Sequence, residues 1–208
     1  METLDLSGTR VSTGGIRALA HFLGCAEDCH LKALRLDKCG VSDGAAAALF
    51  RGVERAKCLK SLSVAKNRVG PKATVALAKA LHGSRTDLRD LNASGNSLHG
   101  LPLAFLCESL AHSVTVRRLD LSWNLLGKVG DDEDPPLPGE APPAVLALAR
   151  CLARNRVLHS LSLANCGLDG AAVEALAAGL EENQSLVAVP ARGTSAFRFP
   201  RGRVAPPR

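Results

Sequence analysis

A cluster of histidines and cysteines near the start of the chain is the grouping best suited to metal chemistry. It comprises His21, Cys25, Cys29 and His30. Four nitrogen and sulfur ligands are the set that a tetrahedral zinc ion takes in proteins. The spacing matches no common zinc finger, however, and His21 falls in a predicted helix whereas both cysteines fall in the loop after it. We therefore favour ordinary loop thiols over a zinc site, and we expect no metal or other cofactor.

Motifs for covalent or phosphate chemistry are missing from the sequence. There is no Gly-x-Ser-x-Gly turn for a nucleophilic serine, no Gly-x-x-x-x-Gly-Lys-Ser/Thr phosphate loop and no dinucleotide fingerprint. Four other histidines fall at the edges of repeated segments and are expected on the surface: His82, His99, His112 and His159. We expect a protein that is not an enzyme.

The elements that would carry these side chains recur at a regular spacing. The pattern Leu-x-x-Leu-x-Leu-x-x-Asn/Cys-x-Leu returns in near-complete copies that begin at Leu31, Leu59, Leu88, Val116 and Leu158. An opening copy begins at Met1 and a decayed closing copy at Leu186, so the steps between copies are 30, 28, 29, 28, 42 and 28 residues. Self-similarity at this period predicts a solenoid of about seven leucine-rich repeats.

Each repeat changes its hydrophobic period halfway along. In the first half, Leu34 and Leu36 alternate with Ala33 and Arg35, which is the period of a strand. In the second half, apolar residues recur at helical spacing, as in residues 170–180. A helix is wider than a strand, so the stack must curve. We expect an α/β horseshoe with parallel strands on the concave face and helices on the convex face.

One polar position per repeat is expected to be buried between neighbouring turns. It is occupied by Thr9, Cys39, Asn67, Asn96, Asn124 and Cys166. A buried Asn can hydrogen-bond backbone groups of adjacent turns, and Cys is a small substitute with a weak donor. These residues are predicted to be structural, which makes Cys39 and Cys166 poor candidates for nucleophiles.

With Asn or Cys at that position and a full helix in each repeat, the chain resembles the ribonuclease-inhibitor-like subfamily of leucine-rich repeat proteins. This subfamily includes the repeats of Ran GTPase-activating proteins and NOD-like receptors. The resemblance covers residues 1–197 and implies the fold. It implies no single function, because members share a scaffold and differ in their surfaces.

Two segments depart from the repeat. Residues 127–143 hold four consecutive acids followed by prolines, and they are expected to form an exposed loop before a helix that resumes near Ala144. Residues 198–208 form a basic tail, and residues 191–208 carry five arginines of a net charge of +6. The tail is either a solvated end or an arm for an acidic protein surface or nucleic acid. The first repeat lacks the usual polar cap, so a fragment, an isoform or a partner covering that edge is expected.

The cysteine count and the hydrophobic pattern bear on the compartment. The seven cysteines are odd in number and scattered, and no signal peptide precedes them, so reduced thiols are expected. No apolar run approaches the roughly 18 residues that span a bilayer. We expect a cytoplasmic protein without membrane insertion, with cytoskeletal, ciliary or organellar assemblies as the settings considered.

The concave face is the surface that we expect to bind a partner. Most outward strand positions carry small residues, which would leave a groove with a few charged or aromatic side chains: Arg35, Asp37, Lys66, Asp90, Arg118, Asp120 and Trp123. Trp123 is the only tryptophan, and tryptophan and arginine dominate binding hot spots. The alternative for Trp123 is that it packs on a neighbouring turn of its own solenoid.

These features favour a non-enzymatic scaffold that binds a protein partner through the groove, the solenoid ends or both, within a multi-subunit complex. The alternative is a GTPase-activating regulator resembling Ran GTPase-activating proteins. Those proteins typically follow their repeats with an acidic segment, whereas this chain ends basic and its acids at 131–134 are internal.

Overall fold

Six strand–helix units follow one another in the computed structural model, which describes residues 2–25, 30–82, 86–131 and 133–187. The strands are β1 (Thr3–Asp5), β2 (Ala33–Arg35), β3 (Ser61–Ser63), β4 (Asp90–Asn92), β5 (Arg118–Asp120) and β6 (Ser160–Ser162). The helices are α1 (Thr13–Cys25), α2 (Asp43–Val53), α3 (Pro71–Leu81), α4 (Gly100–Ala111), α5 (Pro143–Arg154) and α6 (Gly170–Glu181).

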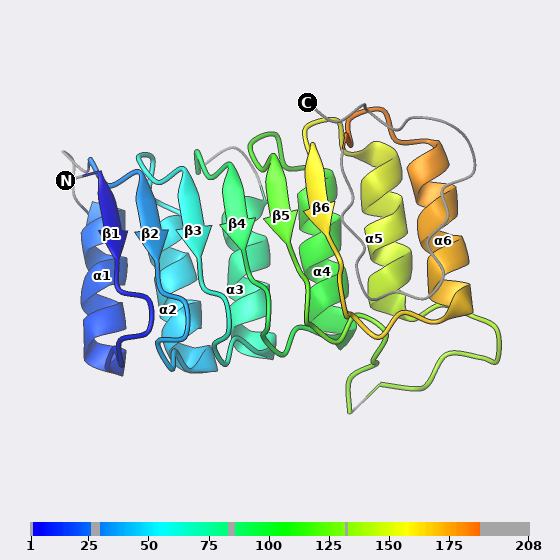
Figure 1. Cartoon of the computed structure of the whole chain (residues 1–208), viewed down its shortest axis with the longest axis horizontal. Coiled ribbons are helices and arrows are strands. Elements are labelled where there is room, and N and C mark those ends of the chain that lie inside the picture. Colours follow the sequence, from blue (N-terminus) through cyan, green and yellow to red (C-terminus); the bar gives the residue numbers. More distant parts are fainter. Residues whose placement is uncertain (1, 26–29, 83–85, 132, 188–208) are drawn as a thin grey trace.

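The strands form one parallel sheet in the order in which they occur in the chain. Its register pairs equivalent positions of successive repeats, for example Leu34 with Leu62 and Leu62 with Leu91. The helices form a second layer behind the sheet (Figure 1). Strands lie about 4.8 Å apart whereas helices are about 10 Å wide, so the sheet becomes the inner, concave face of the stack. The α/β horseshoe predicted from the sequence is confirmed.

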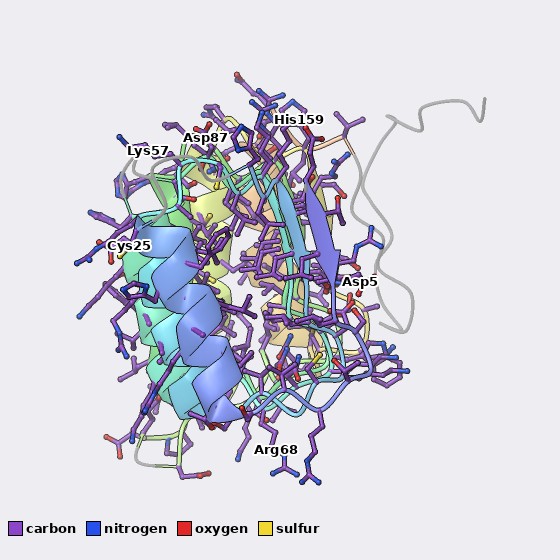
Figure 2. All side chains as sticks on the ribbon, turned by 90° about the vertical axis from the view of Figure 1, so that its left-hand side faces the viewer. Asp5, Cys25, Lys57, Arg68, Asp87 and His159 are labelled. Carbon is purple, nitrogen blue, oxygen red and sulfur yellow. The ribbon has the colours of Figure 1, made fainter. Side chains whose placement is uncertain are left out.

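The core fills the space between the two layers. Figure 2 looks along the stack and shows side chains occupying this space, with Asp5 on the free face of the sheet and Cys25 on the helix side. The central strand residue of each of β2–β6 is a leucine that is at most 3% exposed. Each repeat therefore buries its apolar residues against its neighbours, as expected of a solenoid.

The polar ladder is structural, as predicted, but Thr9 in the first repeat is exposed rather than buried, and its hydroxyl bonds the carbonyl of Leu6 in its own turn. The amide nitrogen of Asn96 donates to the carbonyls of Val64, Ala93 and Ser94 at 3.1, 3.0 and 3.2 Å. Its amide oxygen accepts from the backbone nitrogens of Asn67 and Val69 at 3.2 and 3.0 Å. Where the ladder residue is a cysteine, the thiol keeps the bond to the preceding repeat: Cys39 Sγ donates to the carbonyl of Leu6 at 3.0 Å, with a longer contact of 3.5 Å to the carbonyl of Asp37.

Small residues bring neighbouring helices close together. A Cβ added to Gly52 in α2 would lie 2.3 Å from the carbonyl oxygen of Ala20 in α1, and one on Gly179 would lie 2.3 Å from that of Ala149. Counted back from the following strand, the same position in α4 and α5 is Ser109 and Cys151, whereas in α3, which is followed by a longer loop, it is Leu81. A backbone that approaches this closely leaves room only for glycine or a small side chain.

Two helices are capped by residues of another repeat. The N-cap of α3 is Gly70, which has no side chain, and Asp43 of α2 accepts hydrogen bonds there from the backbone of Gly70, Lys72 and Ala73. The N-cap of α4 makes no side-chain cap bond, and Glu133 accepts from the backbone nitrogen of Leu101 at 2.7 Å. The expectation of a fully exposed proline-rich loop is therefore wrong in part, because Glu133 is hydrogen-bonded to the start of α4.

Several expectations need adjustment or fall outside the described residues. Helix α1 ends at Cys25 rather than before it, and α5 begins at Pro143, one residue before Ala144. Cys58 is disulfide-bonded, so the expectation of reduced thiols is wrong for that residue. The other described cysteines are free: Cys25, Cys39, Cys107, Cys151 and Cys166. Most of the closing repeat and the basic tail lie outside the described residues, which end at 187.

Candidate functional site

The free face of the sheet is hollowed into a groove of about 560 Å³ that runs across all six strands. Its floor consists mostly of serine, asparagine and aspartate side chains. Five of the seven predicted partner-binding residues line it: Arg35, Asp37, Asp90, Arg118 and Asp120. The other two, Lys66 and Trp123, follow β3 and β5 in the turns toward the helices.

Two of the predicted residues, Arg118 and Asp90, are paired with each other in the groove. Arg118 binds Asp90 with two parallel hydrogen bonds, Nε to Oδ1 at 2.5 Å and Nη2 to Oδ2 at 2.7 Å. These bonds raise the pKa of the Arg118 guanidinium above its ordinary value. The Arg118 side chain remains 71% exposed. A bidentate pair fixes the guanidinium plane, so Arg118 is held ready for a second contact.

Hydrogen bonds hold the aspartates of the groove, from the next repeat for Asp37 and from their own turns for Asp5 and Asp120. Asp37 accepts from the Ser63 hydroxyl and from the backbone nitrogen of Ala65 at 2.8 Å. Asp120 accepts from the backbone nitrogen of Ser122 at 2.9 Å. The hydrogen bond from Ser7 lowers the pKa of Asp5, and Arg35 lowers it further. These hydrogen bonds fix the positions of the three carboxylates in the groove.

Trp123 occupies a backbone position that favours glycine. The equivalent residue of every described repeat has a positive φ: Gly8 77°, Lys38 55°, Lys66 55°, Gly95 63°, Trp123 59° and Asn165 55°. This conformation is strained for a bulky residue. The Trp123 side chain is also 63% exposed, which leaves little of it to pack on a neighbouring turn. A strained, exposed tryptophan contributes little to the fold, and both features favour a contact role.

The histidine and cysteine cluster does not form a complete metal site in the described structure. Cys29 lies outside the described residues, and His21 and Cys25 are both on α1. Within the described part of the chain, no group of three or more histidine, cysteine or acidic residues is arranged to hold a metal ion. None of the described helices is long and apolar enough to cross a membrane.

A second set of residues was missed by reading the outward strand positions alone. The residue that immediately precedes each of β2 to β6 is basic. These basic residues occupy the second position of the repeat pattern. They can therefore be found in the sequence, but only when the copies of the repeat are aligned.

Comparison with known proteins agrees with this geometry. A family model described as "Leucine Rich repeat" matches residues 1–20, 27–50 and 154–177. Over 184 residues the chain is 29% identical to the human "NACHT, LRR and PYD domains-containing protein 13", covering 88% of this chain and 16% of that protein. It is 27% identical to the mouse "Ribonuclease inhibitor", covering 89% of this chain and 38% of that protein. The chain has leucine-rich repeats and is similar in sequence to ribonuclease-inhibitor-like proteins.

Solved structures show the same fold at lower sequence identity. "Leiomodin-1 Actin-Binding Site 2 (ABS2)" aligns with a TM-score of 0.55 and 14% identity, covering 82% of this chain and 88% of that one. The tropomodulin C-terminal domain of Caenorhabditis elegans aligns with a TM-score of 0.59 and 16% identity, covering 81% and 92%. This leucine-rich repeat chain spans less than two fifths of the curated relatives that it matches. Its relatives imply a role in protein interaction in general terms.

Proposed function

We propose that this leucine-rich repeat chain is a non-enzymatic module that binds a partner protein through its concave groove, as a subunit of a larger assembly. The observation that carries the proposal is Trp123, a largely exposed tryptophan held at a φ of 59° beside the groove. The repeat imposes a positive φ at this position in every described turn, but it does not require a bulky, exposed aromatic side chain there. Desolvation of such a side chain by a partner is a typical source of binding energy.

The charges of the groove support the same proposal. Arg118, Asp90 and Asp37 are fixed by intramolecular hydrogen bonds before any partner arrives. Binding of a partner therefore costs little free energy for the ordering of these side chains. Two relatives are named for the inhibition of a ribonuclease, so they act on another protein.

Photo-crosslinking tests whether the groove is the binding face. A photoreactive benzoyl-phenylalanine is placed at Ser61 on the groove floor and, as a matched control, at Lys79 on the convex helix α3. Irradiation in native cell extract is expected to capture the same partner repeatedly at Ser61 and not at Lys79. The partner is then purified for direct binding measurements.

Trp123→Gly then tests whether the Trp123 side chain contacts the partner. Glycine is chosen because two other repeats have glycine at the equivalent position, Gly8 and Gly95. The variant is expected to fold normally and to bind the captured partner about 30-fold more weakly, which corresponds to about 2 kcal/mol. Unchanged affinity, or equal crosslinking at Lys79, would contradict the groove proposal. A captured GTPase whose GTP hydrolysis is accelerated by the chain would instead favour a GTPase-activating regulator.

A further inference from the structure

Basic residues form a row along the edge of the sheet where the strands begin. The residue that immediately precedes β2, β3, β4, β5 and β6 is Lys32, Lys60, Arg89, Arg117 and His159, respectively. We call these five residues the basic edge row. Figure 2 shows nitrogen atoms gathered at this edge around the labelled His159, away from Asp5 on the groove face. The corresponding residue before β1 is Glu2.

The backbone fixes the spacing of the row. The carbonyl of Lys60 accepts the backbone N–H groups of Arg89 and Asp90 at 2.8 and 3.0 Å, and that of Arg89 accepts those of Arg117 and Arg118 at 2.8 and 3.0 Å. The same pair of bonds recurs from Lys32 through His159. Each side chain of the row therefore starts one strand spacing, about 4.8 Å, from the next.

The basic residues at the centre of the row form no ion pair within the described part of the chain. Lys32 is paired with Glu2 at 2.5 Å. Among the described residues, no acidic side chain forms an ion pair with Lys60, Arg89 or Arg117. Like charges on directly neighbouring strands repel one another. The row thus disfavours the folded state slightly, and the repeat pattern does not require a basic residue there, since Glu2 occupies the same position.

The adjacent groove argues for a protein ligand over a nucleic acid. The groove surface begins one residue after the row and carries Asp5, Asp37, Asp90 and Asp120 against only two arginines, Arg35 and Arg118. A polyanion laid on the row would have a phosphate backbone beside these carboxylates and would be repelled by them. A polypeptide can present acids to the row and neutral or basic residues to the groove side.

We propose that the basic edge row binds the acidic face of an α-helix in a partner protein. Carboxylates spaced four and three residues apart on a helix recur about every 5.4 Å, close to the strand spacing of about 4.8 Å. The difference of about 0.6 Å per step is small beside the length of lysine and arginine side chains. Carboxylates on one face of an extended strand recur at about 6.6 Å and fall out of step within three repeats. This surface is separate from the groove and does not depend on Trp123.

A designed peptide tests the row directly. The probe is a fluorescently labelled alanine-based helical peptide of about 20 residues with glutamates spaced four and three residues apart on one face. Its binding to the full chain is measured by fluorescence anisotropy at low salt. The triple variant Lys60→Ala, Arg89→Ala, Arg117→Ala is compared with Arg51→Ala, Lys72→Ala, Lys79→Ala. The control removes three exposed basic residues from the convex helices α2 and α3.

The row variant is expected to bind the peptide at least about tenfold more weakly, and the control variant to change affinity by less than about threefold. Exchange of the charges supplies a test that does not rely on loss of binding. Lys60→Glu with Arg89→Glu is expected to bind a peptide whose glutamates are replaced by lysines more tightly than the unaltered chain does.

Three outcomes would overturn the proposal. The first is equal loss of binding in the row and control variants, which would show attraction by net charge alone. The second is equal affinity for a peptide of the same composition with its glutamates distributed around the helix. The third is tighter, row-dependent binding of a single-stranded oligothymidylate than of the acidic peptide, which would make the row a nucleic-acid surface.

Discussion

At the scale of the residue, the ladder asparagines show why one amide serves better than any apolar side chain. Asn96 is buried between two turns and makes five hydrogen bonds to backbone groups of the third and fourth repeats. The amide supplies donors and an acceptor in one planar group. A thiol supplies only the donor half, which is the bond that Cys39 and Cys166 keep to the preceding repeat.

Asn96→Leu is expected to lower the free energy of unfolding by about 3 kcal/mol, because buried N–H and C=O groups lose their partners. Asn96→Cys is the matched control, since cysteine occupies this position in two other repeats. It is expected to cost about half as much, because one hydrogen bond to a carbonyl remains. Urea unfolding followed by circular dichroism measures both. Equal costs for the two variants would mean that the donor half contributes nothing.

At the scale of the element, neighbouring helices pack closely where one of them has a glycine, which carries no side chain, at the contact. Gly52→Ala would place a methyl group 2.3 Å from the carbonyl oxygen of Ala20, which belongs to the backbone of α1 and cannot rotate away. Separating the two helices is expected to lower stability by about 2 kcal/mol or more. Gly44→Ala in the same helix adds a methyl with nothing within 4 Å, and it is expected to be neutral or slightly stabilising. Thermal unfolding of the two variants makes the comparison, and similar melting temperatures would refute the close approach.

Capping between repeats gives a second effect at this scale. The carboxylate of Asp43 accepts hydrogen bonds from three backbone nitrogens at the start of α3, at 2.8 to 3.1 Å. Asp43→Ala is expected to lower the free energy of unfolding by about 1–2 kcal/mol, although α3 itself is unchanged in sequence. Glu174→Ala, an exposed acid in the middle of α6, is the control and is expected to have no measurable effect. Denaturant unfolding at neutral pH distinguishes them. A result in which both variants are neutral would mean that water replaces Asp43 without loss.

At the scale of the whole molecule, the sequence predicts what repeats and misses what crosses between repeats. The strand and helix in each unit follow from leucine spacing, and Leu34, Leu62 and Leu91 are buried as that spacing requires. The pairing of Arg118 with Asp90 was not predicted, because it joins side chains 28 residues apart whose contact depends on the register of the sheet. The cap from Glu133 to α4 was missed because loop 127–143 has no period from which to place it.

Buried thiols in the later repeats are expected to make the whole chain less stable as the pH becomes alkaline. Burial raises the pKa of Cys151 from 9.0 to about 12 and that of Cys166 to about 11, and it raises the pKa of Cys107 well above its ordinary value. In the unfolded chain these thiols lose their protons near pH 9, whereas in the folded chain they keep them. The contribution of these thiols to the free energy of unfolding is therefore fully present below pH 9 and is lost as the pH rises toward 11 to 12.

Each of these thiols is expected to remove about 1.4 kcal/mol of stability for every pH unit above about 9. The chain has no tyrosine, so no phenol ionises in the same range to obscure the effect. Guanidinium unfolding under anaerobic conditions at pH 8, 9 and 10 measures the slope of the free energy of unfolding against pH.

Cys151→Ala combined with Cys166→Ala is expected to flatten this slope, whatever the variant loses in stability at pH 8. Cys25→Ser, which alters an exposed thiol, is expected to leave the slope unchanged. A slope that does not respond to the double substitution would show that these thiols are reached by solvent and ionise in the folded solenoid.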